Sequence, residues 1–166
     1  MNLTIEFSNE AELLSKTIDD REKMERFGSR VFINLLDGLA ELSKLKIIHR
    51  YLSPSSIYVS EDYSRLKFFE FSNAIVENCP NGIKRYDVMP YSLLESKEVS
   101  DNHRKTLQCD FWSVGVVMLE IVVGHKMVQN IMRVSDIERV MSSIEEYIAK
   151  EVFELIDDLL FHPDCL

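Results

Sequence analysis

The feature that most constrains this chain is an apolar run from Phe111 to Val123. A helix that is apolar on almost every face is stable only where protein surrounds it, so this run predicts a helix at the centre of a core. Gly124 follows directly and predicts the end of that helix. The run is about half as long as a membrane span requires and contains Glu120, so we expect no membrane span.

The composition indicates one globular domain inside the cell. With 166 residues, the chain is long enough to bury most of its apolar surface. Its formal net charge is -9, and it lacks the basic stripe of a nucleic-acid-binding protein, so we expect no nucleic-acid partner. The acidic N-terminus is not typical of a secretory signal. Scattered cysteines favour a reducing, intracellular and cytoplasmic location over a disulfide framework; they are Cys79, Cys109 and Cys165.

Helical periodicity recurs on both sides of the central run. A long helix is predicted over residues 23–46, where apolar residues recur at steps of three or four. Ile137 to Ile148 predicts an amphipathic helix. Val152 to Leu160 predicts either a further helix or a continuation of it, ended by Pro163.

The predicted β content is small. Leu3 to Phe7 alternates and predicts a short strand, after which Asn9 caps a helix that reaches about Thr17. Ile57 to Val59 and Leu66 to Phe69 predict the two strands of a hairpin. Residues 72–91 show little periodicity and predict an irregular loop. The predicted fold class is therefore mainly α with a small β element.

Five landmarks, in the right order, resemble the C-terminal lobe of a protein kinase. Ile48 to Ile57 resembles the catalytic loop H-R-D-L-x-x-x-N, and Phe69-Glu70-Phe71-Ser72 resembles the region around D-F-G. Met89-Pro90-Tyr91 stands where kinases carry A-P-E. Asp110 to Gly115 resembles the start of the buried helix that anchors this lobe, and Leu155 to Asp164 resembles a later helix with its D-P ending.

The resemblance implies a protein-kinase C-lobe-like helical domain over residues 1–166. Its implied parts are a remnant of the last N-lobe strand and hinge at 1–8, the long helix at 23–46, a degenerate catalytic loop and hairpin at 47–71, an activation-segment-like loop at 72–91, and a helical remainder at 109–164.

The departures from the kinase pattern fall on the chemistry. Tyr51 stands where the resemblance implies the catalytic Asp, and a phenol, neutral at physiological pH, is no general base. Ser53 replaces the basic residue near the transferred phosphate, and Ser56 replaces the Asn that holds the second magnesium ion. Glu70 and Ser72 replace the Asp and Gly of D-F-G. The resemblance therefore implies no catalytic residue.

Other matched positions are expected to keep structural roles. These motif remnants are His49, Arg50, Asp110, Trp112 and Gly115. His49 and Arg50 are expected to brace the loop, with the Asp110 side chain accepting from nearby backbone amides. For Arg50 we favour an internal contact to a carboxylate or carbonyl over a phosphorylated loop residue.

Two further expectations concern cofactors. The chain begins at the last N-lobe strand, so we expect it to lack the Gly-rich loop, the strand lysine and the helix glutamate that hold nucleotide in kinases. Glu70 could still bind magnesium, but the second ligand expected at Ser56 is weak, so no metal and no cofactor are predicted.

Three functional hypotheses follow. The favoured one is a noncatalytic protein-binding, scaffolding or structural subunit, which covers the face left by the missing N-lobe with a protein partner or a second copy of the chain. Its host would be a larger assembly, for example a cytoskeletal one. The alternatives are a regulator that still binds nucleotide around Glu6 to Ser8, and half of a split kinase completed by a partner.

Overall fold

The structure, a computed structural model, describes residues 12–76, 107–131 and 133–162. The elements in chain order are β1 (Glu12–Leu13), α1 (Leu14–Thr17), α2 (Arg21–Lys44), β2 (Ile47–Ile48), the 3-10 turn η1 (Pro54–Ser56), β3 (Ile57–Val59), β4 (Leu66–Phe68), the 3-10 turn η2 (Phe71–Asn73), β5 (Ile75–Val76), α3 (Gln108–Val123), α4 (His125–Val128), α5 (Val134–Ile144) and α6 (Lys150–Phe161). The prediction of a mainly helical fold with a small β element is confirmed.

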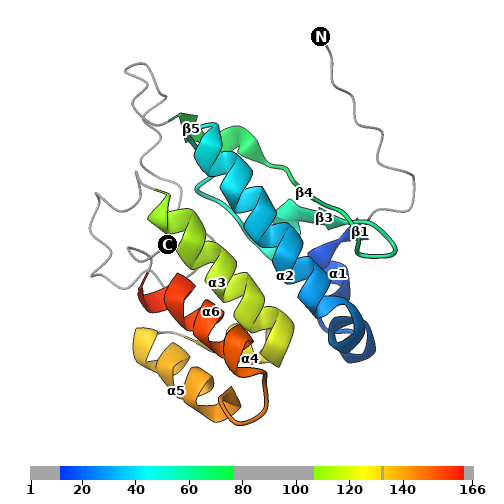
Figure 1. Cartoon of the computed structure of the whole chain (residues 1–166), viewed down its shortest axis with the longest axis vertical. Coiled ribbons are helices and arrows are strands. Elements are labelled where there is room, and N and C mark those ends of the chain that lie inside the picture. The colour runs from blue at the N-terminus through cyan, green and yellow to red at the C-terminus, as the bar shows by residue number, and fades with distance from the viewer. Residues whose placement is uncertain (1–11, 77–106, 132, 163–166) are drawn as a thin grey trace.

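Helix α3 lies at the centre of the molecule, with α2 on one side and α6 on the other (Figure 1). Val114, Val117 and Leu119 are completely buried, as the apolar run predicts. The helix ends at Gly124, whose φ of 86° lies in the left-handed region that glycine adopts without strain. The prediction of a central buried helix is therefore confirmed.

Helix α2 begins two residues before its predicted start and ends two residues before its predicted end. The Asp20 side chain caps it by accepting from the Lys23 amide at 3.2 Å. The helix lies so close to strand β4 that a Cβ on Gly38 would lie 2.5 Å from Cε2 of Phe68. The sequence pattern found the apolar face of α2, but it gave no sign of this close approach.

The predicted hairpin is present as β3 and β4, which pair antiparallel and form a three-stranded sheet with β1 in the order β1-β3-β4. The prediction that the helix ending at Thr17 runs from Asn9 is wrong, because Glu12 and Leu13 are in a strand and only Leu14 to Thr17 is helical. The backbone of these two residues pairs with Val59 and Tyr58 of β3. Pairing with a strand distant in sequence leaves no periodic signal near residue 12.

The segment predicted to be irregular also contains a short strand. Ile75 and Val76 form β5, which pairs antiparallel with Ile48 and Ile47 of β2. This strand pairing joins the start of the catalytic-like loop to the segment that follows β4. Several predicted features lie outside the described residues: Leu3 to Phe7, Asn9, Met89 to Tyr91 and Pro163.

The C-terminal part contains separate helices. Helices α5 and α6 are divided by residues 145–149, and the short helix α4 was not predicted. Helix α6 packs on α3, and α5 lies beside α6 on the side away from α3 (Figure 1). Within the described ranges, none of the helices combines the length and the apolar character that a membrane crossing needs.

Candidate functional site

The residues that resemble the catalytic loop connect β2 to β3 beside the first turn of α3. Two buried N–H groups in this loop donate to one carboxylate: the His49 amide to Oδ2 of Asp110 at 2.7 Å, and the Arg50 amide to Oδ1 at 2.8 Å. Asp110 itself is completely buried. The contact that the resemblance implied for Asp110 is therefore present, and it ties the loop to the central helix.

Burial raises the pKa of the Asp110 carboxyl to about 6, while the two amides, the Cys109 thiol and the charge of Arg50 act in the opposite direction. Burial has the larger effect because an ionised carboxylate in a protein interior loses its water shell. The Cys109 Sγ lies 3.8 Å from Oδ1. Arg50 is buried and has a φ of 68°, an uncommon backbone conformation for a side-chain-bearing residue.

The His49 ring joins the loop to the end of β4. Its Nε2 lies 2.8 Å from the Phe69 carbonyl, and its Nδ1 lies 3.3 Å from the Tyr51 amide nitrogen. These partners assign the tautomer: Nδ1 accepts from Tyr51, and Nε2–H donates to Phe69. Burial lowers the pKa of His49, which favours this neutral form. His49 therefore supports the loop through its neutral ring.

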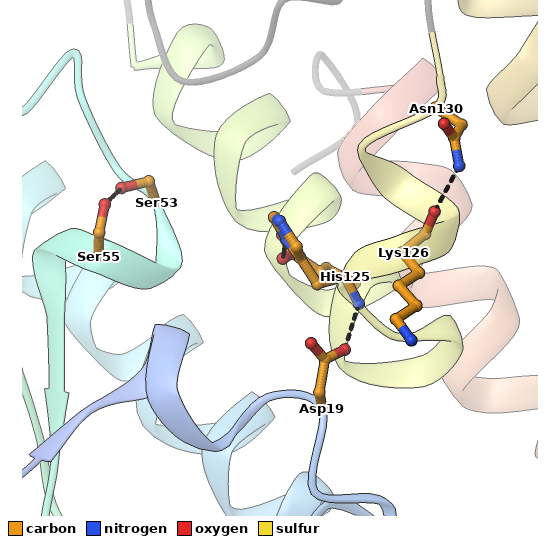
Figure 2. A network of polar contacts seen from close by, with 7 residues as sticks. Asp19, Ser53, Ser55, His125, Lys126 and Asn130 are labelled. Atoms are coloured by element: carbon orange, nitrogen blue, oxygen red, sulfur yellow. Dashed lines mark hydrogen bonds and ion pairs between the residues drawn. The ribbon is translucent and has the colours of Figure 1, made fainter.

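Three serines close the loop on itself. The Ser56 hydroxyl accepts from the Ser53 amide at 2.9 Å and lies 3.0 Å from the carbonyls of both Tyr51 and Ser53. Ser53 and Ser56 are completely buried, and Oγ of Ser53 lies 2.9 Å from Oγ of Ser55 (Figure 2). Both the donor and the acceptor capacity of Ser56 are thus used inside the loop.

The remaining predicted positions face the outside of this region. Tyr51 is half-buried, and Glu70 and Ser72 are exposed. Glu70 has a φ of 67°, again in the left-handed region. The charge of its carboxylate raises the pKa of His49, against the larger effect of burial. Across residues 12–76, 107–131 and 133–162, no three His, Cys, Asp or Glu side chains come together as a metal site would require.

Trp112 and Gly115 lie on the side of α3 that packs against α6. The Trp112 ring is perpendicular to that of Phe161, with 6.4 Å between centroids. A Cβ on Gly115 would lie 3.0 Å from two carbons of Leu160, so the glycine allows the two helices to approach closely. These two residues belong to a helix–helix contact and are separate from the loop.

Sequence analysis missed a second polar contact that fixes α3. Arg21, at the start of α2, donates to the carbonyls of Ile121 and Val122 at 2.8 Å each and so caps the end of α3. Asp19 accepts from the His125 amide at 2.8 Å (Figure 2). The partners are about one hundred residues apart, and no local pattern marks such a pair.

Comparison with known proteins identifies the family. Residues 1–162 match the family model described as "Protein kinase domain". The chain belongs to the protein kinase superfamily.

Individual relatives are more distant. A Dictyostelium discoideum protein named as a probable inactive serine/threonine-protein kinase is 29% identical over 99 residues, which are 58% of this chain and 25% of that protein. A probable dual specificity protein kinase YAK1 homolog of Encephalitozoon cuniculi is 30% identical over 69% of this chain and 29% of its own. An Aurora kinase of Schizosaccharomyces pombe is 25% identical over 96% of this chain and 45% of its own. The chain thus spans less than half the length of each of these relatives.

Proposed function

We propose that this kinase-family chain is a pseudokinase, without phosphotransferase activity, that acts as a protein-binding, scaffolding or structural subunit of a larger assembly. The observation that carries the proposal is the loop itself. The residue at the position of the catalytic base is Tyr51, and a neutral phenol does not accept the proton of a substrate hydroxyl as a carboxylate does.

The serine contacts support the same proposal. Ser53 is buried, so its hydroxyl is directed into the loop and not toward a phosphate. Ser56 uses its hydroxyl to hold the carbonyls of Tyr51 and Ser53, which leaves it poorly suited to a magnesium ion. The loop thus keeps hydrogen bonds that fix its backbone. In the proposal, the side chains that would perform phosphoryl transfer are replaced by Tyr51, Ser53 and Ser56. One relative carries the word inactive in its name, which is consistent with this proposal.

The scaffolding part of the proposal is supported by apolar surface around the loop. Phe71, in the 3-10 turn η2, and Val76, in β5, are large apolar side chains that are 44% and 51% exposed. Such surface in a soluble protein is commonly covered by a partner. We propose a protein partner on this face, with a second copy as the alternative, and a cytoplasmic location in a larger assembly.

The two alternative hypotheses remain open to direct test. The nucleotide-binding alternative places the bound base around Glu6 to Ser8, which lie outside the described residues, and no contact within the described ranges favours it. Completion of a split kinase would require Tyr51 and Ser56 to be compatible with phosphoryl transfer. The arrangement of both residues argues against that chemistry.

The test is purification of the tagged chain from its native cells, followed by size-exclusion chromatography. Recovery in a stoichiometric large complex would support the proposal, and a free monomer would contradict its scaffolding part. A phosphate-transfer assay with ATP on the same material tests the noncatalytic part. Transfer that is abolished by Glu70→Ala would contradict it, whereas transfer that persists in that variant would indicate a contaminating kinase.

A further inference from the structure

Two exposed arginines in the first half of α2 contact the same aromatic ring. The guanidinium carbons of Arg26 and Arg30 lie over the Phe27 ring, 5.1 Å and 5.8 Å from its centroid. Because these arginines are four residues apart on a helix, they are neighbours on its surface. The Phe27 ring in turn stacks on Tyr63, with centroids 5.0 Å apart and planes at 9°. Two positive charges are therefore held beside each other on one aromatic platform.

The turn between β3 and β4, residues 60–65, fixes this platform and one of the arginines. Tyr63 is 2% exposed, and its carbonyl accepts from the Asn34 side chain of α2 at 3.2 Å. Arg30 donates to the Asp62 carbonyl at 3.3 Å. The Asp62 carboxylate accepts from two serine hydroxyls of its own turn, at 2.7 Å and 2.8 Å. The turn therefore positions Arg30 through a neutral carbonyl group.

The two arginines differ from the lysine one turn earlier on α2. The Nζ atom of Lys23 lies 3.6 Å from a carboxylate oxygen of Glu12 and 3.8 Å from one of Asp20. In the part of the chain that the structure describes, no carboxylate lies within ion-pair distance of Arg26 or Arg30. Their mutual repulsion is thus not offset by an ion pair there, and a bound anion would offset it.

The chemistry of the pair favours a compact anion with more than one charge. A phosphate monoester carries roughly −1.5 to −2 charges at pH 7 and offers several acceptor oxygens, which guanidinium groups bind in pairs. A carboxylate carries a single charge and is matched by one arginine. A nucleic-acid strand would extend over the exposed Glu22, Glu25 and Glu61 on a chain of net charge -9, and these charges would repel it.

We propose that Arg26 and Arg30 bind the phosphate group of a phosphomonoester. Phosphorylated serine or threonine side chains of proteins and small phosphate esters both carry this group. The site goes beyond the proposed pseudokinase function and does not depend on it, because it lies on α2 and the β3–β4 turn and uses no residue of the catalytic-like loop.

The test is an NMR titration of the isotope-labelled full chain at constant ionic strength. The probes are inorganic phosphate and N-acetylphosphoserine amide, and the unphosphorylated N-acetylserine amide is the ligand control. The test variants are Arg26→Gln and Arg30→Gln. Arg139→Gln is the matched control, since Arg139 is an exposed helical arginine that lies 3.3 Å from a carboxylate oxygen of Asp136.

We expect saturable shifts centred on Phe27 with both phosphate probes and none with N-acetylserine amide. Binding should weaken by roughly 3- to 10-fold in each test variant, because each loses one charge-assisted contact, and should be unchanged in Arg139→Gln. Tighter binding of the phosphoserine probe than of inorganic phosphate would support the site and indicate a phosphorylated protein as its ligand. Equal binding would support the site and indicate a small phosphate ester.

Three results would overturn the proposal: no saturable shifts with either phosphate probe, shifts centred away from α2 and the β3–β4 turn, or unchanged affinity in both Arg26→Gln and Arg30→Gln. None of them bears on the pseudokinase proposal, which the native complex and the phosphate-transfer assay test separately.

Discussion

Helix α3 and the loop from His49 to Ser56 meet at Asp110, but they are stabilised by different forces. Helix α3 is buried among apolar side chains of α2 and α6, so close packing holds it in place. The loop has little regular structure, and hydrogen bonds from its own backbone to buried side chains fix it. Packing tolerates many apolar sequences, whereas the loop depends on a few polar groups, so substitutions should be tolerated less well at the polar contacts of the loop than on the apolar faces of α3.

The largest effect is expected in the packed region. Leu119→Ala removes a completely buried side chain from α3 and leaves a cavity, so the free energy of unfolding should fall by about 4 kcal/mol. Urea denaturation measures this change. Ile33→Ala is the matched control on α2, where the side chain is 60% exposed, and it should change stability by no more than about 0.5 kcal/mol. Similar losses in both variants would contradict a core centred on α3.

The second variant breaks the loop at its attachment to α3. Asp110→Ala leaves the His49 and Arg50 amides without their acceptor, and each buried N–H then costs about 1–3 kcal/mol. Removal of a buried carboxylate offsets part of this cost, so a net loss of about 2 kcal/mol is expected. Amide hydrogen exchange should accelerate most at residues 49–51. Asp37→Ala, on the exposed face of α2, is the control, and uniform acceleration in Asp110→Ala would argue against a local clamp.

The third prediction concerns the pH dependence of that clamp. Burial raises the folded-state pKa of Asp110 to about 6 from its ordinary 3.8, so its contribution to stability is greatest at low pH and decreases as pH rises through 6. Between pH 7.5 and pH 5, the destabilisation caused by Asp110→Ala should therefore grow by about 1 kcal/mol. Thermal and urea unfolding of both proteins at the two pH values measure this difference.

The effect of His49 on stability has the opposite pH dependence to that of Asp110. The pH dependence of Asp110 is therefore measured as the difference in stability between the unmodified chain and Asp110→Ala. Burial lowers the pKa of His49, so its contribution is present above its ordinary pKa of 6.5 and is lost as pH falls below that value. Since His49 is present in both proteins, its effect largely cancels in the difference. A destabilisation by Asp110→Ala that shrinks on acidification would contradict the raised pKa of Asp110.

The smallest effect is expected at Tyr63, whose buried hydroxyl lacks the hydrogen-bond partners that the Asp110 carboxylate has. The Tyr63 hydroxyl is buried and has no hydrogen-bond partner among the described residues, while its ring stacks on Phe27 with centroids 5.0 Å apart. Tyr63→Phe keeps the stack and removes the unsatisfied hydroxyl, so stability should rise by about 1 kcal/mol, measured by urea unfolding. A loss of stability would show that the hydroxyl has a partner, such as a bound water.

The helices could be predicted more fully than the loop geometry. Periodic apolar residues located α2 and α3, because a helix repeats its buried face locally. Strand β1 was missed, since its pairing with Tyr58 and Val59 depends on a segment distant in sequence. For the site, the resemblance to kinases predicted that Asp110 accepts from loop amides, but it did not predict that the Ser56 hydroxyl is used inside the loop.

The sequence by itself determined the central buried helix and the hairpin, because hydrophobic periodicity is a property of neighbouring residues. It also indicated the family, because the order of the motifs can be read directly along the chain. The tertiary structure alone decided which distant groups meet: Arg21 with the end of α3, Gly38 with Phe68, and Asp110 with the His49 and Arg50 amides. Such contacts depend on the relative placement of whole elements. That placement is fixed only when the core is packed, since local conformation does not specify the distance between segments far apart along the chain.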